Sequence, residues 1–227
     1  MKKLLTAILM VFSSYSLASA ELGVNIGISG QAGLFAATAT EFDKGTHGTT
    51  SGTNEQVRES EYLEVGFASG FLEKTLGDRF MVGVSYVPSA IATETNESVR
   101  VDYTARNFGT IAATSTQKVQ VDFKDMTTLY VGVNVSENAY VRLGKVTVDV
   151  ITNETLGTGS TYGNASLDGT VVGFGYNHSM GNGIFIRGEG NYMNFDGTSV
   201  TSANGVNKIS LDHLDGVSGQ LSIGKSF

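Results

Sequence analysis

Six charged residues are spaced so that they fall on one face of a predicted sheet. In each alternating segment they lie opposite the large apolar side chains, on the side that an enclosed interior would take. Charges of both signs in a narrow interior must pair, because an isolated buried charge is strongly disfavoured. We therefore predict an ion-paired network that closes the interior, with the gate of a narrow ion path as the alternative. The six residues are Glu64, Asp122, Lys124, Arg142, Arg187 and Glu189.

Patterns typical of catalytic and metal sites are sparse. The histidines His47, His178 and His213 belong to distant segments, and the chain has no cysteine for thiolate ligands or disulfides. Asp212, His213 and Asp215 form an acid–histidine group, which we interpret as a solvated loop end rather than a catalytic pair. The sequence contains no nucleophile elbow, phosphate-binding loop or zinc-ligand spacing. We predict no enzyme activity, catalytic residue, cofactor or metal site.

The elements that must position these residues are β-strands. Apolar and polar residues alternate with period two in eight segments, as in half-buried strands. The 29 glycines, 9 tyrosines, 12 phenylalanines and single proline also suit long β-ladders. In the fifth segment the apolar phase shifts after Lys145, and we expect a β-bulge there. The segments are residues 22–34, 63–71, 80–86, 119–135, 141–150, 172–176, 184–192 and 217–227.

The connections between these segments alternate in length. Residues 41–60, 89–118, 151–169 and 195–208 are long connections, whereas residues 73–78, 136–138 and 179–183 are short turns. Short turns on one side and long loops on the other are typical of outer-membrane barrels. We predict an all-β fold, an antiparallel up-and-down transmembrane β-barrel of eight strands, with ten as the alternative. Eight strands require that residues 98–103 form a hairpin with residues 118–123 above the membrane, because a spanning strand needs about 9–11 residues.

Side-chain size favours a membrane barrel over a soluble sandwich. The face opposite the large apolar residues is rich in Gly, Ser, Asn and Ala, which suit a narrow lumen better than a solvated surface. A closed barrel also pairs every backbone amide, as the hydrocarbon core demands. Aromatic residues near the strand ends would form girdles at the two membrane interfaces. They are Tyr62, Phe71, Phe80, Tyr86, Tyr140, Tyr192, Phe195 and Phe227.

The first twenty residues have the three parts of a secretory signal peptide. Lys2 and Lys3 give a basic start, an apolar stretch follows, and Ala18-Ser19-Ala20 has the form of a cleavage site. We predict that residues 1–20 are the signal peptide and that residues 21–227 form the barrel. Loss of the two lysines moves the formal net charge from −7 to −9. Such an acidic chain lacks the basic stripe that nucleic-acid binding requires.

The last segment carries a family resemblance. Val217, Leu221, Ile223 and Phe227 alternate along it and end in an aromatic residue, although Lys225 stands where an aromatic or apolar residue is usual. With the signal peptide and the rhythm of strands and turns, this resembles the small outer-membrane barrel family that includes the OmpA transmembrane domain, OmpX and the opacity-type surface proteins. The resemblance implies export to the outer membrane of a Gram-negative bacterium. It also implies that the barrel-assembly machinery recognises the final strand.

The resemblance is specific for architecture and nearly silent on activity. We expect a structural or surface-recognition barrel with a largely plugged lumen and long outer loops, surrounded by outer-membrane lipid and lipopolysaccharide. A narrow porin-like channel for ions or small solutes is one alternative, and a rim enzyme acting on lipid or peptide is a less favoured one. The outer loops are acidic, and an external ligand would bind there. Their carboxylates are Glu41, Asp43, Glu55, Glu59, Glu61, Glu94, Glu97 and Asp102.

Overall fold

The computed structural model describes ten β-strands and several of the turns between them. The described residues are 23–43, 55–91, 96–102, 113–155, 161–180, 182–203, 205 and 207–227. The predicted signal peptide, residues 1–20, lies outside them, as do His47 and Glu94. Among the described residues there is no helix long and apolar enough to cross a membrane.

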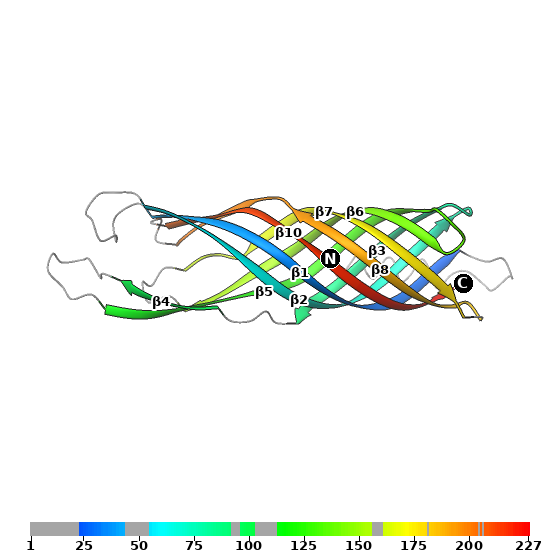
Figure 1. Cartoon of the computed structure of the whole chain (residues 1–227), viewed down its shortest axis with the longest axis horizontal. Helices are drawn as coiled ribbons and strands as arrows, with labels where there is room; N and C mark the ends of the chain where they lie inside the picture. Colours follow the sequence, from blue (N-terminus) through cyan, green and yellow to red (C-terminus); the bar gives the residue numbers. More distant parts are fainter. Residues whose placement is uncertain are drawn as a thin grey trace.

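The strands form one antiparallel sheet that closes on itself as a barrel (Figure 1). Their long alternating runs contain no interior proline except Pro88, so the ladders continue over many residues. The strands are β1 (Val24–Asp43), β2 (Glu55–Leu76), β3 (Phe80–Ile91), β4 (Asn96–Asp102), β5 (Ala113–Asn134), β6 (Ala139–Thr155), β7 (Ala165–Ser179), β8 (Ile184–Phe195), β9 (Thr198–Thr201) and β10 (Asn207–Ser226).

The ring itself consists of eight strands. β3 and β4 both pair with β5, and β8 and β9 both pair with β10, so that β4 and β9 continue the lines of β3 and β8. β1 pairs with β10 and closes the ring. The predicted antiparallel up-and-down barrel and its eight strands are therefore confirmed. β4 forms the expected hairpin with β5, although its partners are residues 113–119 rather than 118–123.

The register around the ring gives the strands a strong tilt. Starting at Val24 on β1 and following paired residues through each strand, the path returns to β1 at Leu34, ten residues further along. Such a stagger requires the strands to be inclined to the barrel axis, typically by about 35–45°, and Figure 1 shows this inclination. The path passes through Lys74, Val82, Val131, Leu143, Val172, Tyr192 and Val217.

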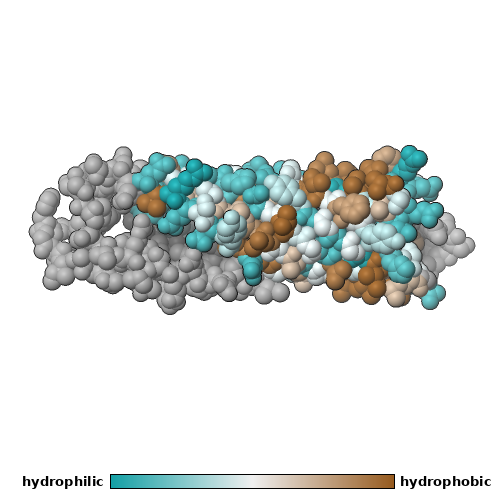
Figure 2. Space-filling model, viewed as in Figure 1, coloured by the Kyte–Doolittle hydropathy of each residue, from teal (hydrophilic) through white to brown (hydrophobic). Residues whose placement is uncertain are grey.

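An apolar belt surrounds the part of the barrel nearest the short turns. Figure 2 shows hydrophobic residues concentrated at the end where Figure 1 places the C-terminus. These side chains point outward and are exposed in the isolated chain, as expected for a surface that faces lipid. They include Ile26, Ile28, Phe80, Val131, Val133, Leu143, Phe174, Ile186, Leu221 and Ile223.

The interior near the short turns combines charged and polar residues with aromatic rings such as Phe71 and Phe185, whereas towards the long loops it is apolar. Near the turns the buried residues include arginine, glutamate, glutamine and serine. Further up, twelve buried apolar residues form a cluster that we call the apolar layer, and every strand of the ring contributes to it. Its members are Phe35, Val65, Phe67, Val87, Met126, Val146, Val148, Leu167, Val171, Met193, Phe195 and Leu214.

The structure corrects the expected position of the β-bulge. The register of β6 runs without interruption past Lys145, so the predicted β-bulge is not there. Val146 and Val148 continue the interior face of Tyr140, and the residue type changes because the apolar layer begins at that height. The bulge lies instead on β5, where Asp125 has a positive φ of 51° and the register shifts.

The aromatic girdles are less complete than predicted. Phe71, Tyr140 and Phe195 are buried inside the barrel, because they lie on interior positions of β2, β6 and β8. The remaining aromatic residues that were expected at the interfaces are not in the buried core. They are Tyr62, Phe80, Tyr86, Tyr192 and Phe227.

Candidate functional site: the interior of the barrel

A bidentate ion pair crosses the lumen near the short turns. Arg187 on β8 donates from its two terminal nitrogens to the two carboxylate oxygens of Glu73 on β2, at 2.5 and 2.7 Å. The Arg187 side chain is 3% exposed and that of Glu73 is 0% exposed. Asn177 accepts a hydrogen bond from Arg187 Nε at 2.7 Å, so that three strands are tied together. The bidentate geometry and the additional hydrogen bond offset the large cost of removing both charges from water.

A second ion pair lies directly above the first. Arg142 on β6 contacts Glu189 on β8, with 2.6 Å between Arg142 Nη2 and Glu189 Oε1, and both side chains are buried. The same Arg142 nitrogen donates to Asn191 Oδ1 at 3.1 Å. Arg142 Nε and Asn191 Nδ2 are buried and find no hydrogen-bond acceptor among the described residues. The second pair is therefore less completely satisfied than the first.

Two tyrosines interlock the ion pairs. Tyr130 donates a hydrogen bond to Glu73 at 2.7 Å, while its ring stacks on Arg142, 4.7 Å from the guanidinium carbon to the ring centroid. Tyr140 does the converse, because its hydroxyl donates to Glu189 and its ring lies 5.1 Å from the guanidinium carbon of Arg187. Each tyrosine thus bonds the carboxylate of one pair and stacks on the arginine of the other. We call these side chains together with Asn191 the polar network.

Glycines on the barrel wall make room for this network. A Cβ added to Gly175 would lie 2.3 Å from the Tyr140 ring, and one added to Gly83 would lie 2.6 Å from the Tyr130 ring. Any larger residue would push the tyrosine away from its carboxylate. Gly83 and Gly175 therefore do more than keep the lumen narrow, because each leaves the space that one particular tyrosine ring occupies.

Serine and glutamine side chains fill the remaining interior beside the polar network. Gln31 on β1 donates to Ser218 on β10 at 2.6 Å. Gln220 donates to Ser29 at 3.0 Å and to Ser222 at 3.2 Å. The bonds from Gln31 to Ser218 and from Gln220 to Ser29 join β1 and β10 on the inner side of the ring closure.

The structure brings together half of the six charged residues predicted for the interior. Arg142, Arg187 and Glu189 lie inside, as described above. Glu64 and Lys124 are exposed. Asp122 adjoins Phe123, which packs against the apolar layer, and strand alternation therefore directs Asp122 outward. The interior position predicted for Glu64, Asp122 and Lys124 is wrong.

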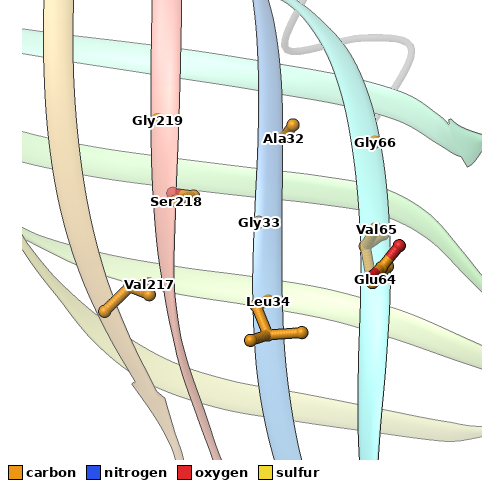
Figure 3. Close-up of a pocket in the computed structure, with 9 residues that line it drawn as sticks. All are labelled: Ala32, Gly33, Leu34, Glu64, Val65, Gly66, Val217, Ser218 and Gly219. Carbon is orange, nitrogen blue, oxygen red and sulfur yellow. The ribbon is translucent and has the colours of Figure 1, made fainter.

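Two features turn these three charged residues outward, the apolar layer and the bulge on β5. Val65 and Phe67 turn inward, because the lumen at their height is apolar, and Glu64 beside Val65 turns outward. Figure 3 shows Glu64 with Leu34 and Val217 on the wall formed by β10, β1 and β2, where they line a shallow groove of about 710 Å³. On β5 the extra residue at Asp125 reverses the phase above it, which moves Lys124 outside.

Sequence reasoning missed the most buried carboxylate. Glu73 was placed in a short turn, whereas β2 continues to Leu76 and carries Glu73 on the same face as Phe71. Two-residue spacing from Phe67 and Phe71 would have found it, once those rings were recognised as interior. The roles of Tyr130 and Tyr140 had no comparable signal, because their partners lie on strands distant in sequence.

The remaining candidate residues lie on the outer surface. His213 Nε2 is 2.7 Å from Asp215 Oδ1, and Tyr192 donates to the other Asp215 oxygen at 3.1 Å. Asp212 instead accepts a hydrogen bond from Thr40 at 2.6 Å. Within the described residues, no three acidic or histidine side chains form a group that could hold a metal ion. The predicted assembly residues Val217, Leu221, Ile223 and Phe227 all point outward.

Comparison with solved structures finds likenesses to several outer-membrane proteins. The outer membrane protease OmpT from Escherichia coli shares 9% identity, with 93% of this chain and 99% of that chain aligned and a TM-score of 0.43. The outer membrane protein AlkL shares 13%, over 94% and 95% of the two chains, with a TM-score of 0.42. Ail of Yersinia pestis, solved with the heparin analogue sucrose octasulfate, shares 11%, over 88% and 99%, with a TM-score of 0.37.

No family model and no curated protein matches the sequence. At these identities and TM-scores, the structural matches carry no argument about what this chain binds or does. The assignment of a membrane-spanning barrel rests on the closed ring and the apolar belt of the chain itself.

Proposed function

We propose that this protein is a closed outer-membrane barrel that presents its long loops and upper strands to the outside. The observation that supports the proposal is the set of buried side chains inside the ring. Two buried ion pairs, interlocked by Tyr130 and Tyr140, cross the lumen near the short turns, and the apolar layer lies above them. An eight-stranded ring leaves an interior just wide enough for side chains to fill. The protein would therefore act by binding at its outer surface and not by passing solutes through its lumen.

The outer surface fits this role. β1 and β2 remain paired up to Asp43 and Glu55, far beyond the 9–11 residues that a spanning strand needs. Glu59 and Glu61 are exposed on this projecting part. We propose that an external ligand meets this acidic surface, and that lipopolysaccharide and other outer-membrane lipids contact the apolar belt. The proposal assigns no catalytic step and no cofactor to the protein.

The test is the conductance of residues 21–227, refolded into a planar lipid bilayer. We expect no steady openings in salt solution over voltages of either sign. A porin of known conductance, inserted into the same membrane, shows that single channels would be detected. Steady openings of the wild-type protein would overturn the closed barrel and favour a narrow channel instead.

A further inference from the structure

We propose that the barrier to ions in this barrel is the apolar layer, and that the polar network is not needed for it. The inference rests on the closed barrel proposed above and assigns the closure to one of two levels. The polar network is the more conspicuous plug, because it contains four charges and fills the lumen near the short turns. The two levels nevertheless differ in composition. The apolar layer has no side-chain hydrogen-bonding groups, whereas the polar network contains buried polar atoms without a hydrogen-bond partner among the described residues.

The apolar layer extends across the whole cross-section. Its twelve buried apolar members come from all eight strands of the ring. Phe35 packs against two other rings. Its ring centroid lies 6.4 Å from that of Phe67, in an edge-to-face arrangement, and 6.4 Å from that of Phe195. An ion crossing this level would meet no group that could replace its water, and such a constriction excludes ions by remaining dry.

A small cavity within the layer has the same character. Its walls are formed by apolar residues alone, and all of them except Phe123 are members of the apolar layer. A cavity without polar partners does not retain water. The void therefore does not offer water a path through the layer. It is lined by Phe35, Val65, Phe67, Phe123, Met126, Val148, Phe195 and Leu214.

The polar network has the opposite character. It carries two arginines and two glutamates, and Arg142 Nε and Asn191 Nδ2 lack an acceptor among the described residues. Such groups hydrogen-bond readily to water, so this level can be hydrated once a side chain is shortened. Thr128, on the interior face of β5 between Met126 and Tyr130, marks the boundary between the two levels.

The first experiment compares the two levels by conductance. The double variant Arg142→Ala/Arg187→Ala opens the polar network, and Phe35→Ser/Phe67→Ser makes the apolar layer polar. We expect the first to stay silent in a planar bilayer, because the apolar layer is intact. Openings should appear when all four substitutions are combined, because only then can both levels be hydrated. Leu34→Ser, next to Phe35 but outward, is the matched control and should stay silent.

A second measurement is independent of whether the serine variant folds. The natural chain has no cysteine, so Thr128→Cys introduces a single thiol just below the apolar layer. A small charged thiol reagent is added to the outer side of oriented vesicles. We expect labelling at least about tenfold slower than that of an outward Lys145→Cys, because a charged reagent must cross the dry level. The protection should persist in the Arg142→Ala/Arg187→Ala background.

The outcomes separate this inference from the proposed function. Suppose that the wild type is silent. Openings of the Arg142→Ala/Arg187→Ala variant, or fast outer-side labelling of the Thr128→Cys thiol in that background, would then overturn the inference and leave the closed barrel standing. A folded variant with all four substitutions that stays silent would also overturn it, because the apolar layer would then not be what closes the barrel. Openings in the wild type would overturn the proposed function itself.

Discussion

Tyr130 and Tyr140 show how single residues hold the lower interior together. Each bonds the carboxylate of one ion pair and stacks on the arginine of the other, so the two pairs cannot move independently. A ring placed against a guanidinium also replaces part of the hydration that the cation loses on burial. The four charged side chains and the two tyrosines therefore behave as one unit, and removing any member disturbs the rest.

Removing Glu73 should reveal how strongly this unit stabilises the barrel. Glu73→Ala leaves the guanidinium of Arg187 buried without its bidentate partner, and breaking a buried pair in this way typically costs about 3–5 kcal/mol. We expect a loss of this size in the free energy of unfolding. The measurement is urea unfolding of the refolded protein in lipid vesicles, followed by far-ultraviolet circular dichroism.

The matched control for Glu73 is an exposed ion pair of the same molecule. Asp168 contacts Lys145 at 3.5 Å, and their side chains are 55% and 66% exposed. Because exposed pairs contribute about 0–1 kcal/mol, Asp168→Ala should change the stability little. If Glu73→Ala and Asp168→Ala lowered the free energy of unfolding equally, the buried ion pair would stabilise the barrel no more than the exposed one.

At the scale of the element, the bulge on β5 is the feature with the widest consequence. Asp125 adopts a φ of 51°, and its carboxylate accepts a hydrogen bond from Tyr86 on the neighbouring strand. The extra residue lets Phe123 face inward above the bulge and Met126 face inward below it. Without it, the upper half of β5 would turn its apolar residues away from the apolar layer.

Substitutions at Asp125 should separate backbone strain from loss of the hydrogen bond. A β-branched residue is strained at positive φ by about 1–2 kcal/mol, whereas asparagine tolerates this region. We expect Asp125→Val to lose stability by about that amount more than Tyr86→Phe, which removes only the hydrogen bond. Asp125→Asn should stay near the wild type. The readout is the urea midpoint, and a Val variant as stable as the Asn variant would exclude strain at the bulge.

The elements themselves could be predicted from the sequence, but the direction of some faces could not. Alternation shows which residues share a face, and the rhythm of short and long connections supplied the eight strands. It does not show which face is inside when both contain large apolar residues. On β2 the predicted lumen charge Glu64 is outside and the overlooked Glu73 is inside, because Val65, Phe67 and Phe71 line the interior.

At the scale of the whole molecule, the barrel changes from a membrane type to a water-soluble type along its axis. Around the polar network the wall is apolar outside, as Leu129, Val131 and Val172 show. Around the apolar layer many of the neighbouring outward residues are polar, including Lys124 and Asp168, although Leu34 beside Phe35 and Val172 beside Val171 are apolar. A soluble barrel buries apolar side chains and exposes polar ones, so the upper part does not depend on lipid for its core.

The final strand should matter more for assembly than for the stability of the finished barrel. We propose that Val217, Leu221, Ile223 and Phe227 form the surface that the barrel-assembly machinery reads. Phe227 is held at the ring closure by backbone bonds with Val24, at 2.9 and 3.3 Å, which need no aromatic side chain. The aromatic side chain of Phe227 points outward, and Lys225 Nζ lies 5.2 Å from the centroid of its phenyl ring.

Phe227→Ala should therefore refold in detergent with a stability close to that of the wild type, yet accumulate several-fold less in the outer membrane of cells. The control is Phe174→Ala on β7, because Phe174 also points outward and is 57% exposed, compared with 46% for Phe227. Both lose a similar lipid-facing ring, so both should lose a similar, small amount of stability in lipid. Folded barrel in membrane fractions is measured by its heat-dependent gel mobility. Equal accumulation of the two variants would show that the last residue carries no assembly signal.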